Sequence, residues 1–260
     1  MAFDHDEFIR LITDYYEFCS RRFWNLPIQQ APPGGWPAIT DDIIEKLNKN
    51  EAAAKLIRHL PYPEYNMDPE YTSFTPHIMQ NTYIADYRCE AFTKAIRNGE
   101  RRHPINPVAT PESVLIATSY GNGGYYVVVD TNEGYVYWSD IQGQHDEPAP
   151  ELNKVLEKYE GQEEQDWRLV SNVYRPADFF ALCKQRFLEM RWIGFGPDEI
   201  SALTMDRPWG CDEEHNRMVD ALKRAGWPGD AEGQGYDLKL AIDLLNESEE
   251  EGDSDLEAEG

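Results

Sequence analysis

The stretch SVLIATSYGNGGYYVVVDTNEGYVYWSD, residues 113–140, decides the fold of this chain. Three runs rich in β-branched and aromatic residues, Val114 to Thr118, Tyr125 to Val129 and Tyr135 to Trp138, are each about the length of one strand. Turns containing Gly and Asn separate them, and residues 130–134 form a short hairpin loop in which Asn and Gly tolerate positive φ. The pattern predicts an antiparallel β-meander.

A helix is predicted at the start of the chain. Asp4 followed by Glu7 forms a capping box, and Phe3 and Phe8 have the spacing of a hydrophobic staple. Apolar residues then recur with a period near 3.6 as far as Phe23, which predicts a buried helix face.

A second helix is predicted after the meander. Pro176 suits its first turn, and Gly194 is expected to stop it. Phe180 and Phe187 lie about two helical turns apart, so both can reach the sheet together. We therefore expect a single α+β domain in which this helix packs against an antiparallel sheet containing residues 113–138.

Other segments have weaker local signals. Helices are expected from Thr40 to about His59, near Tyr83 to Asn98, through Leu152 to Tyr159, from Glu213 to Ala225 and from Tyr236 to Asn246; residues 166–170 are expected to form a strand. Residues 1–246 are thus expected to form the α+β domain with an N-terminal helical extension. Residues 247–260 contain eight acidic and no basic residues, which predicts a disordered acidic tail.

The charge of the chain indicates its partners. It has 24 basic and 48 acidic residues, a net charge of −24, and residues 1–246 are acidic in their own right. Such a field repels nucleic acid and anionic lipid and attracts basic proteins. No apolar run approaches the roughly 20 residues that a membrane span needs. The four cysteines are far apart, which favours reduced thiols in a cytoplasmic or nuclear protein.

No segment predicts a cofactor or a metal. Gly121 to Gly124 precedes a strand instead of a helix N-terminus, so a turn is favoured over a phosphate site. Cys211 and His215 have helical i, i+4 spacing, but no second pair of ligands accompanies them.

One segment leaves an enzymatic alternative open. Asp140, His145, Asp146 and Glu147 crowd the segment that leaves the meander, and a hydrolase could use them for acid–base chemistry. A solvated acidic loop is favoured, because no Ser or Cys pairs with His145 in a known catalytic order.

The aromatic residues of the meander suggest a contact surface. Side chains alternate along a strand, so Tyr125, Val127 and Val129 face opposite to Tyr126 and Val128. One face is core, and the other either carries exposed aromatic residues or lies beneath a second layer of helices. On the first alternative, the partner-binding residues are Tyr126, Trp138, Asp140, Asp146 and Glu147.

The order of these parts resembles the SUKH superfamily, which includes fungal cell-wall-synthesis regulators and bacterial immunity proteins. The resemblance rests on GGYYVVVD at residues 123–130, GYVYW at residues 134–138 and a later helix beginning ADFF at residue 177. GWP at residues 35–37 and RHLPY at residues 58–62 are similar to uncharacterised fungal proteins. The resemblance implies a non-enzymatic α+β binding module, a regulatory adaptor or an immunity-like inhibitor, with no catalytic residues to carry over. Together with the charge, it suggests a basic protein partner.

Overall fold

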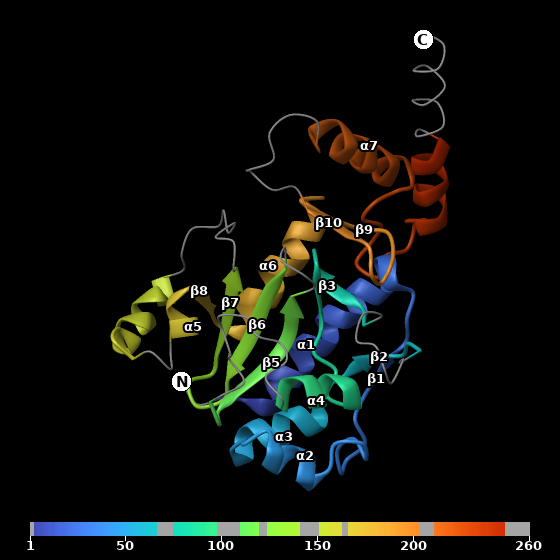
Figure 1. Cartoon of the computed structure of the whole chain (residues 1–260). Coiled ribbons are helices and arrows are strands. Elements are labelled where there is room, and N and C mark those ends of the chain that lie inside the picture. Colours follow the sequence, from blue (N-terminus) through green and yellow to red (C-terminus); the bar gives the residue numbers. More distant parts are fainter. Residues whose placement is uncertain are drawn as a thin grey trace, which may run out of the picture.

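The computed structural model describes residues 3–66, 75–97, 110–119, 124–140, 151–162, 166–202 and 211–247 (Figure 1). The helical elements are α1 (His5–Cys19), the π-helix η1 (Ser20–Trp24), α2 (Asp41–Lys46), α3 (Glu51–His59), α4 (Glu90–Arg97), the 3₁₀ helix η3 (Glu151–Tyr159), α5 (Asp166–Leu169), α6 (Pro176–Leu188), α7 (Cys211–Arg224) and a helix at residues 238–247. The strands are β1 (Ile28–Gln29), β2 (Tyr62–Pro63), β3 (His77–Met79), β4 (Thr82–Ile84), β5 (Ser113–Ser119), β6 (Tyr125–Asp130), β7 (Tyr135–Asp140), β8 (Ser171–Tyr174), β9 (Trp192–Gly194) and β10 (Ile200–Ala202).

The main sheet has six strands in the order β3-β4-β5-β6-β7-β8, and every neighbouring pair is antiparallel. The predicted three-stranded meander is confirmed as β5, β6 and β7. Two strands before it and one after it extend the sheet, while β1-β2 and β9-β10 form two small separate pairs. The predicted α+β class with a single domain is confirmed.

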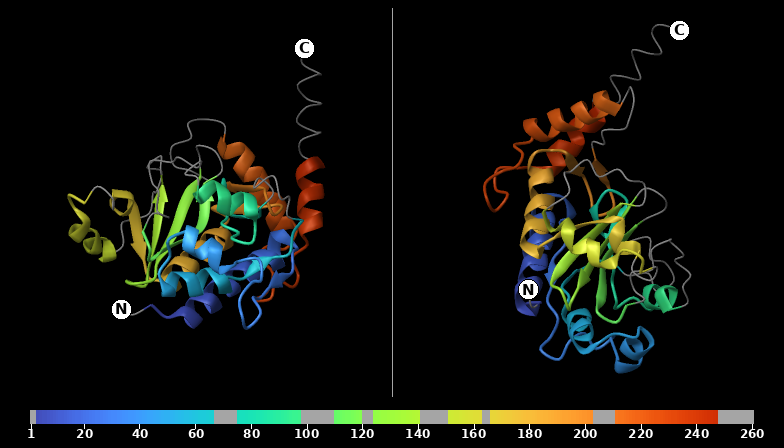
Figure 2. Two further views of the ribbon diagram at one scale, coloured as in Figure 1. Left: turned by 60° about the horizontal axis from the view of Figure 1, so that its bottom comes forward. Right: turned by 90° about the vertical axis from the view of Figure 1, so that its left-hand side faces the viewer.

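Helices α1 and α6 run side by side over one face of the sheet (Figure 2). Their buried aromatic side chains form the centre of the core: Phe180 of α6 lies 5.8 Å from Phe8 and 5.5 Å from Tyr15 of α1, measured between ring centroids. Phe187 stacks on Phe23 at 4.8 Å. The predicted contact of α6 with the sheet is confirmed, since α6 packs against β7.

The two helix starts follow their sequence signals. The Asp4 side chain accepts a hydrogen bond from the Glu7 backbone N–H at 3.0 Å, and the rings of Phe3 and Phe8 lie 5.7 Å apart. Pro176 is the first residue of α6, where its missing N–H costs no helical hydrogen bond.

The expected exposed aromatic face does not exist for Tyr126 and Trp138. In the β6-β7 register Trp138 pairs with Val127 and Tyr126 with Ser139, so the two aromatic side chains lie on opposite faces. Trp138 is 0% exposed, and Tyr126 is 6% exposed. The alternative of a covering helical layer holds for Trp138, because α6 packs Phe179 against its indole at 5.8 Å.

Other expected boundaries were wrong where packing overrode local propensity. The helix after Thr40 is interrupted: Asn48 has a φ of +52° between α2 and α3. Tyr83, expected in a helix, lies in β4. Residues 166–169, expected in a strand, form helix α5, and the strand follows as β8. Gly194 lies in β9, because α6 ends at Leu188 and Met190 takes a φ of +56°.

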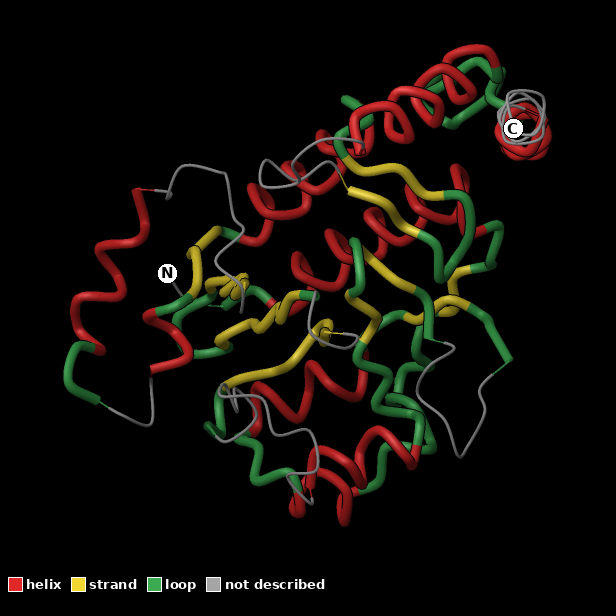
Figure 3. The backbone as a smooth tube through the Cα atoms, turned by 45° about the horizontal axis from the view of Figure 1, so that its top comes forward, coloured by secondary structure: helices red, strands yellow, loops and turns green. Residues whose placement is uncertain are grey.

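The two predicted C-terminal helices are confirmed as α7 and the helix at residues 238–247. They lie beyond the β9-β10 pair, away from the main sheet (Figure 3). A small second apolar cluster joins them to β9 through Ile193, Leu222 and Ala241. No helix in the described ranges is long and apolar enough to cross a bilayer. The predicted acidic tail begins at Glu247, the last described residue, and its remaining residues lie outside the described part.

Candidate functional site

The residues predicted to contact a partner do not form one surface in the described part of the chain. Tyr126 and Trp138 are buried on opposite faces of the sheet. Asp140 is the last residue of β7, opposite Tyr125. Asp146 and Glu147 lie outside the described residues, as does His145 of the hydrolase alternative.

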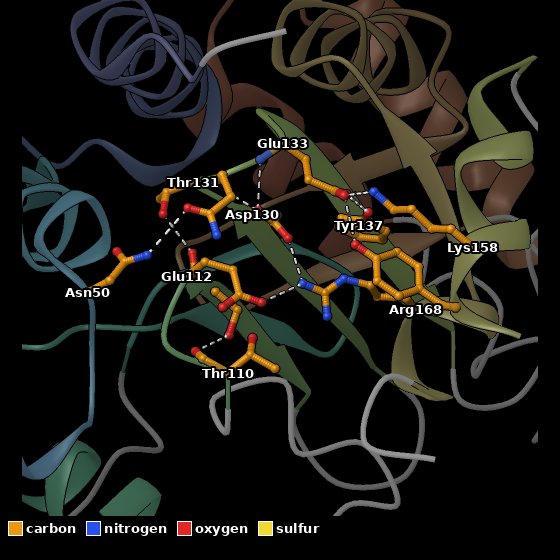
Figure 4. A network of polar contacts seen from close by, with 12 residues as sticks. Asn50, Thr110, Glu112, Asp130, Thr131, Glu133, Tyr137, Lys158 and Arg168 are labelled. Carbon is orange, nitrogen blue, oxygen red and sulfur yellow. Dashed lines mark hydrogen bonds and ion pairs between the residues drawn. The ribbon is translucent and has the colours of Figure 1, made fainter. Parts of the chain in front are cut away.

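A polar network covers the sheet face opposite α6 (Figure 4). The Arg168 side chain, 1% exposed, donates from Nη2 to Asp130 Oδ2 at 2.6 Å and to Glu112 Oε1 at 3.1 Å. Its guanidinium carbon lies 4.1 Å from the ring centroid of Trp167 and 4.7 Å from that of Tyr159. Burial opposes the charge of Arg168, but the hydrogen bond with Asp130 and the electrostatic attraction of Asp130, Tyr159 and Tyr137 together outweigh it and raise the pKa.

The same network continues to Glu133 in the β6-β7 turn. Its carboxylate accepts hydrogen bonds from Tyr137 Oη at 2.6 Å and Tyr159 Oη at 2.8 Å, and it pairs with Lys158. Burial raises the pKa of Tyr137, so its hydroxyl stays protonated as a donor. Each of these side chains has a partner of complementary charge or hydrogen-bonding capacity. We therefore interpret the network as a structural contact that stabilises the packing of η3 and α5 against the sheet.

A cavity of about 310 Å³ lies at the other end of β7 from Asp140, where α1, α6 and the β6-β7 turn meet. Phe3, Phe8 and Leu11 of the α1 segment and Tyr135 of β7 supply most of its apolar wall. Phe8 is 1% exposed and the other three are half-buried, so the cavity opens from the hydrophobic core toward solvent. The capping box of α1 therefore lies directly beside an aromatic floor.

The charged residues at this cavity are mainly acidic. Asp4 and Glu7 line it, and both are exposed; Glu7 lies 3.9 Å from the guanidinium of Arg10 on the same helix. Arg175 lines it as well, but its guanidinium lies 3.7 Å from the carboxylate of Asp178 on α6. Carboxylates beside an apolar aromatic floor suit a long cationic side chain, whose methylene stem packs on the rings while its charge pairs with the acids.

The sequence showed some of the residues that line this cavity, but not that they lie at a cavity. Asp4, Glu7, Phe3 and Phe8 were identified as a helix start, which they are. Nothing in the sequence indicated that residues 134–135 and 175–177 would lie beside them, because those contacts span more than a hundred residues.

The described residues contain no group of three or more His, Cys, Asp or Glu side chains placed to hold a metal ion. Cys19, Cys89 and Cys183 are free and buried. In the comparisons with known proteins, no family model matches the chain, and neither a curated protein nor a solved structure is similar to it.

Proposed function

We propose that this chain is a non-catalytic protein-binding module of the cytoplasm or nucleus that binds a basic protein, as a regulatory adaptor or an immunity-like inhibitor. The cavity between α1 and α6 receives a Lys or Arg side chain of that partner. The observation that carries the proposal is the pairing of Asp4 and Glu7 with an aromatic floor in one cavity. The resemblance of the meander to the SUKH superfamily supports the same class of function.

The size and charge of the surface favour this partner. A volume of about 310 Å³ is at the lower end of known ligand pockets, so it fits one long side chain better than a folded segment. Exposed acidic side chains outnumber exposed Lys and Arg across the described residues. This surplus speeds the approach of a basic protein, while the desolvated contact in the cavity slows its release.

Affinity purification from the native cell would supply the partner, and a fluorescent oligo-arginine peptide serves as a probe before it is known. Glu7→Gln and Asp4→Asn each remove one negative charge at the cavity, and Asn preserves the helix cap that Asp4 provides. We expect each to weaken binding about tenfold at low salt, equivalent to about 1.4 kcal/mol.

The matched control is Asp6→Asn. Asp6 is an exposed acid in the same helical turn that does not line the cavity. Its neutralisation changes the net charge equally, so we expect only a small effect on the association rate. Equal weakening by the Asp6 and Glu7 variants would contradict a specific cation pocket, and salt-independent binding would contradict a basic partner altogether.

A further inference from the structure

A second, larger cavity of about 460 Å³ lies between the π-helix η1 and the first turn of the helix at residues 238–247. Three basic side chains line it: Arg21 and Arg22 of η1 and Lys239 of the C-terminal helix. Arg21 lies 3.5 Å from Glu17 and 3.9 Å from Glu232, and Lys239 lies 2.6 Å from Asp243, so Arg22 is the cation of the three for which the described residues provide no ion pair. In a chain with a net charge of −24, three cations around one cavity are unusual. The proposed protein-binding role leaves this cluster unexplained.

Arg22 is the buried cation among the residues that line this cavity. Its side chain is 4% exposed, and its Nε and Nη1 atoms are buried without a hydrogen-bond acceptor in the described part of the chain. Its Nη2 has one long hydrogen bond, 3.4 Å, to the backbone carbonyl of Asp230. The guanidinium carbon also lies 4.2 Å from the ring centroid of Phe18. Buried cations are ordinarily paired with an anion, but no carboxylate of the described residues forms an ion pair with this guanidinium.

The surrounding groups add further donors. Tyr236 lines the same cavity, and its hydroxyl is likewise buried without a partner among the described residues. Burial first, and then the neighbouring Arg21, lower the pKa of Arg22, which indicates that its charge is poorly compensated. Asp237 also lines the cavity, but its carboxylate accepts from the Leu240 N–H at 3.0 Å and so caps the helix.

We propose that this cavity binds a small phosphate monoester, with the phosphate group between Arg22 and Tyr236. The guanidinium fork of Arg22 and the hydroxyl of Tyr236 supply donors that match the terminal oxygens of a phosphate. Arg21 and Lys239, which already pair with carboxylates, add positive charge nearby. The N-terminus of the 238–247 helix adds a favourable dipole, part of which the capping carboxylate of Asp237 already uses. Leu238 and Ile242 provide an apolar wall for the organic part of the ligand.

Nε and Nη1 of Arg22 are shielded from solvent in this structure, so binding requires the guanidinium to turn toward the cavity. The phosphate then replaces the long bond to the Asp230 carbonyl with charge-assisted bonds. A cavity of about 460 Å³ lies within the range of small-molecule sites.

The test is isothermal titration calorimetry of the full chain with glucose 6-phosphate, with glucose and inorganic phosphate as the two partial probes. We expect saturable binding of glucose 6-phosphate, weaker binding of inorganic phosphate and none of glucose. Binding of inorganic phosphate that equals or exceeds that of glucose 6-phosphate would overturn the monoester assignment. Sodium chloride at matched ionic strength controls for general screening.

The Tyr236→Phe variant separates binding from folding. It removes a hydroxyl that has no hydrogen-bond partner among the described residues, so we expect unchanged or increased thermal stability together with about tenfold weaker phosphate binding. Arg22→Gln is expected to abolish binding at a temperature where circular dichroism shows it folded, while Arg224→Gln, at an exposed position outside the cavity, is expected to bind normally. Wild-type affinity in both the Tyr236 and Arg22 variants, or no binding by the wild type, would overturn the proposal.

Discussion

The ion pair between Arg168 and Asp130 is predicted to be the most important polar contact for stability. Both side chains are 1% exposed, and their Nη2 and Oδ2 atoms are 2.6 Å apart. Arg168→Met keeps most of the apolar stem but leaves the Asp130 carboxylate buried without its counter-charge. Removing one partner of a buried ion pair typically lowers the free energy of unfolding by about 3–5 kcal/mol. We therefore start from a loss of about 4 kcal/mol.

Two features of the site change the loss of stability expected for Arg168→Met. Asp130 Oδ1 still accepts from the backbone N–H groups of Asn132 and Glu133, at 2.8 and 2.9 Å, which partly stabilises the remaining charge. The loss of the guanidinium over the rings of Trp167 and Tyr159 acts in the other direction, at roughly 0.5–1 kcal/mol for each ring. We therefore expect a net loss of about 3–4 kcal/mol in the free energy of unfolding.

A double-mutant cycle measured by urea denaturation with tryptophan fluorescence isolates the pair. Asp130→Asn retains a carbonyl oxygen for the turn but removes the charge, and the double variant contains neither charge. We expect the double variant to be more stable than the sum of the two single losses predicts, by about 2 kcal/mol. If the two single losses of stability were additive in the double variant, or if Arg168→Met lost less than about 1 kcal/mol, the pair would not stabilise the packing of η3 and α5 against the sheet.

Three further predictions follow from the core. Trp138→Ala is expected to lower the free energy of unfolding by about 4 kcal/mol, because the indole is fully buried; a urea midpoint close to that of the wild type would contradict its place in the core. Gly124→Ala is expected to prevent stable folding, since its Cβ would lie 1.9 Å from the Asn81 carbonyl oxygen, whereas Gly34→Ala, with no atom within 4 Å, is expected to melt like the wild type in a thermal scan. Burial lowers the pKa of Lys49 from 10.5 to about 7, so the folded state binds fewer protons than the unfolded state between these values, and stability is expected to rise with pH across that window. Lys49→Met should flatten this slope in urea titrations at several pH values, and an unchanged slope would show that Lys49 is not its source.

Residues close together in the sequence determined the parts of the fold that were predicted correctly. The hairpin between β6 and β7 depends on Asp130 and Gly134, which has a φ of +76°, and the start of α1 depends on Asp4 and its neighbours. Pro176 sets the first turn of α6 in the same way. Each signal acts within about one helical turn or one hairpin loop, so the sequence alone contains its whole cause.

Tertiary packing decided the rest. Trp138 looked suitable for a partner contact, but Phe179 of α6 and Trp192 of β9, both later in the chain, pack against it and bury it. Residues 166–169 became a helix because Trp167 packs on Tyr137 at 5.3 Å and Arg168 reaches Asp130, contacts that outweigh the strand propensity of the segment. Both proposed cavities likewise join residues far apart in the sequence. Alternation along a strand tells which side chains share a face, but what covers that face is set by elements that meet only when the chain folds.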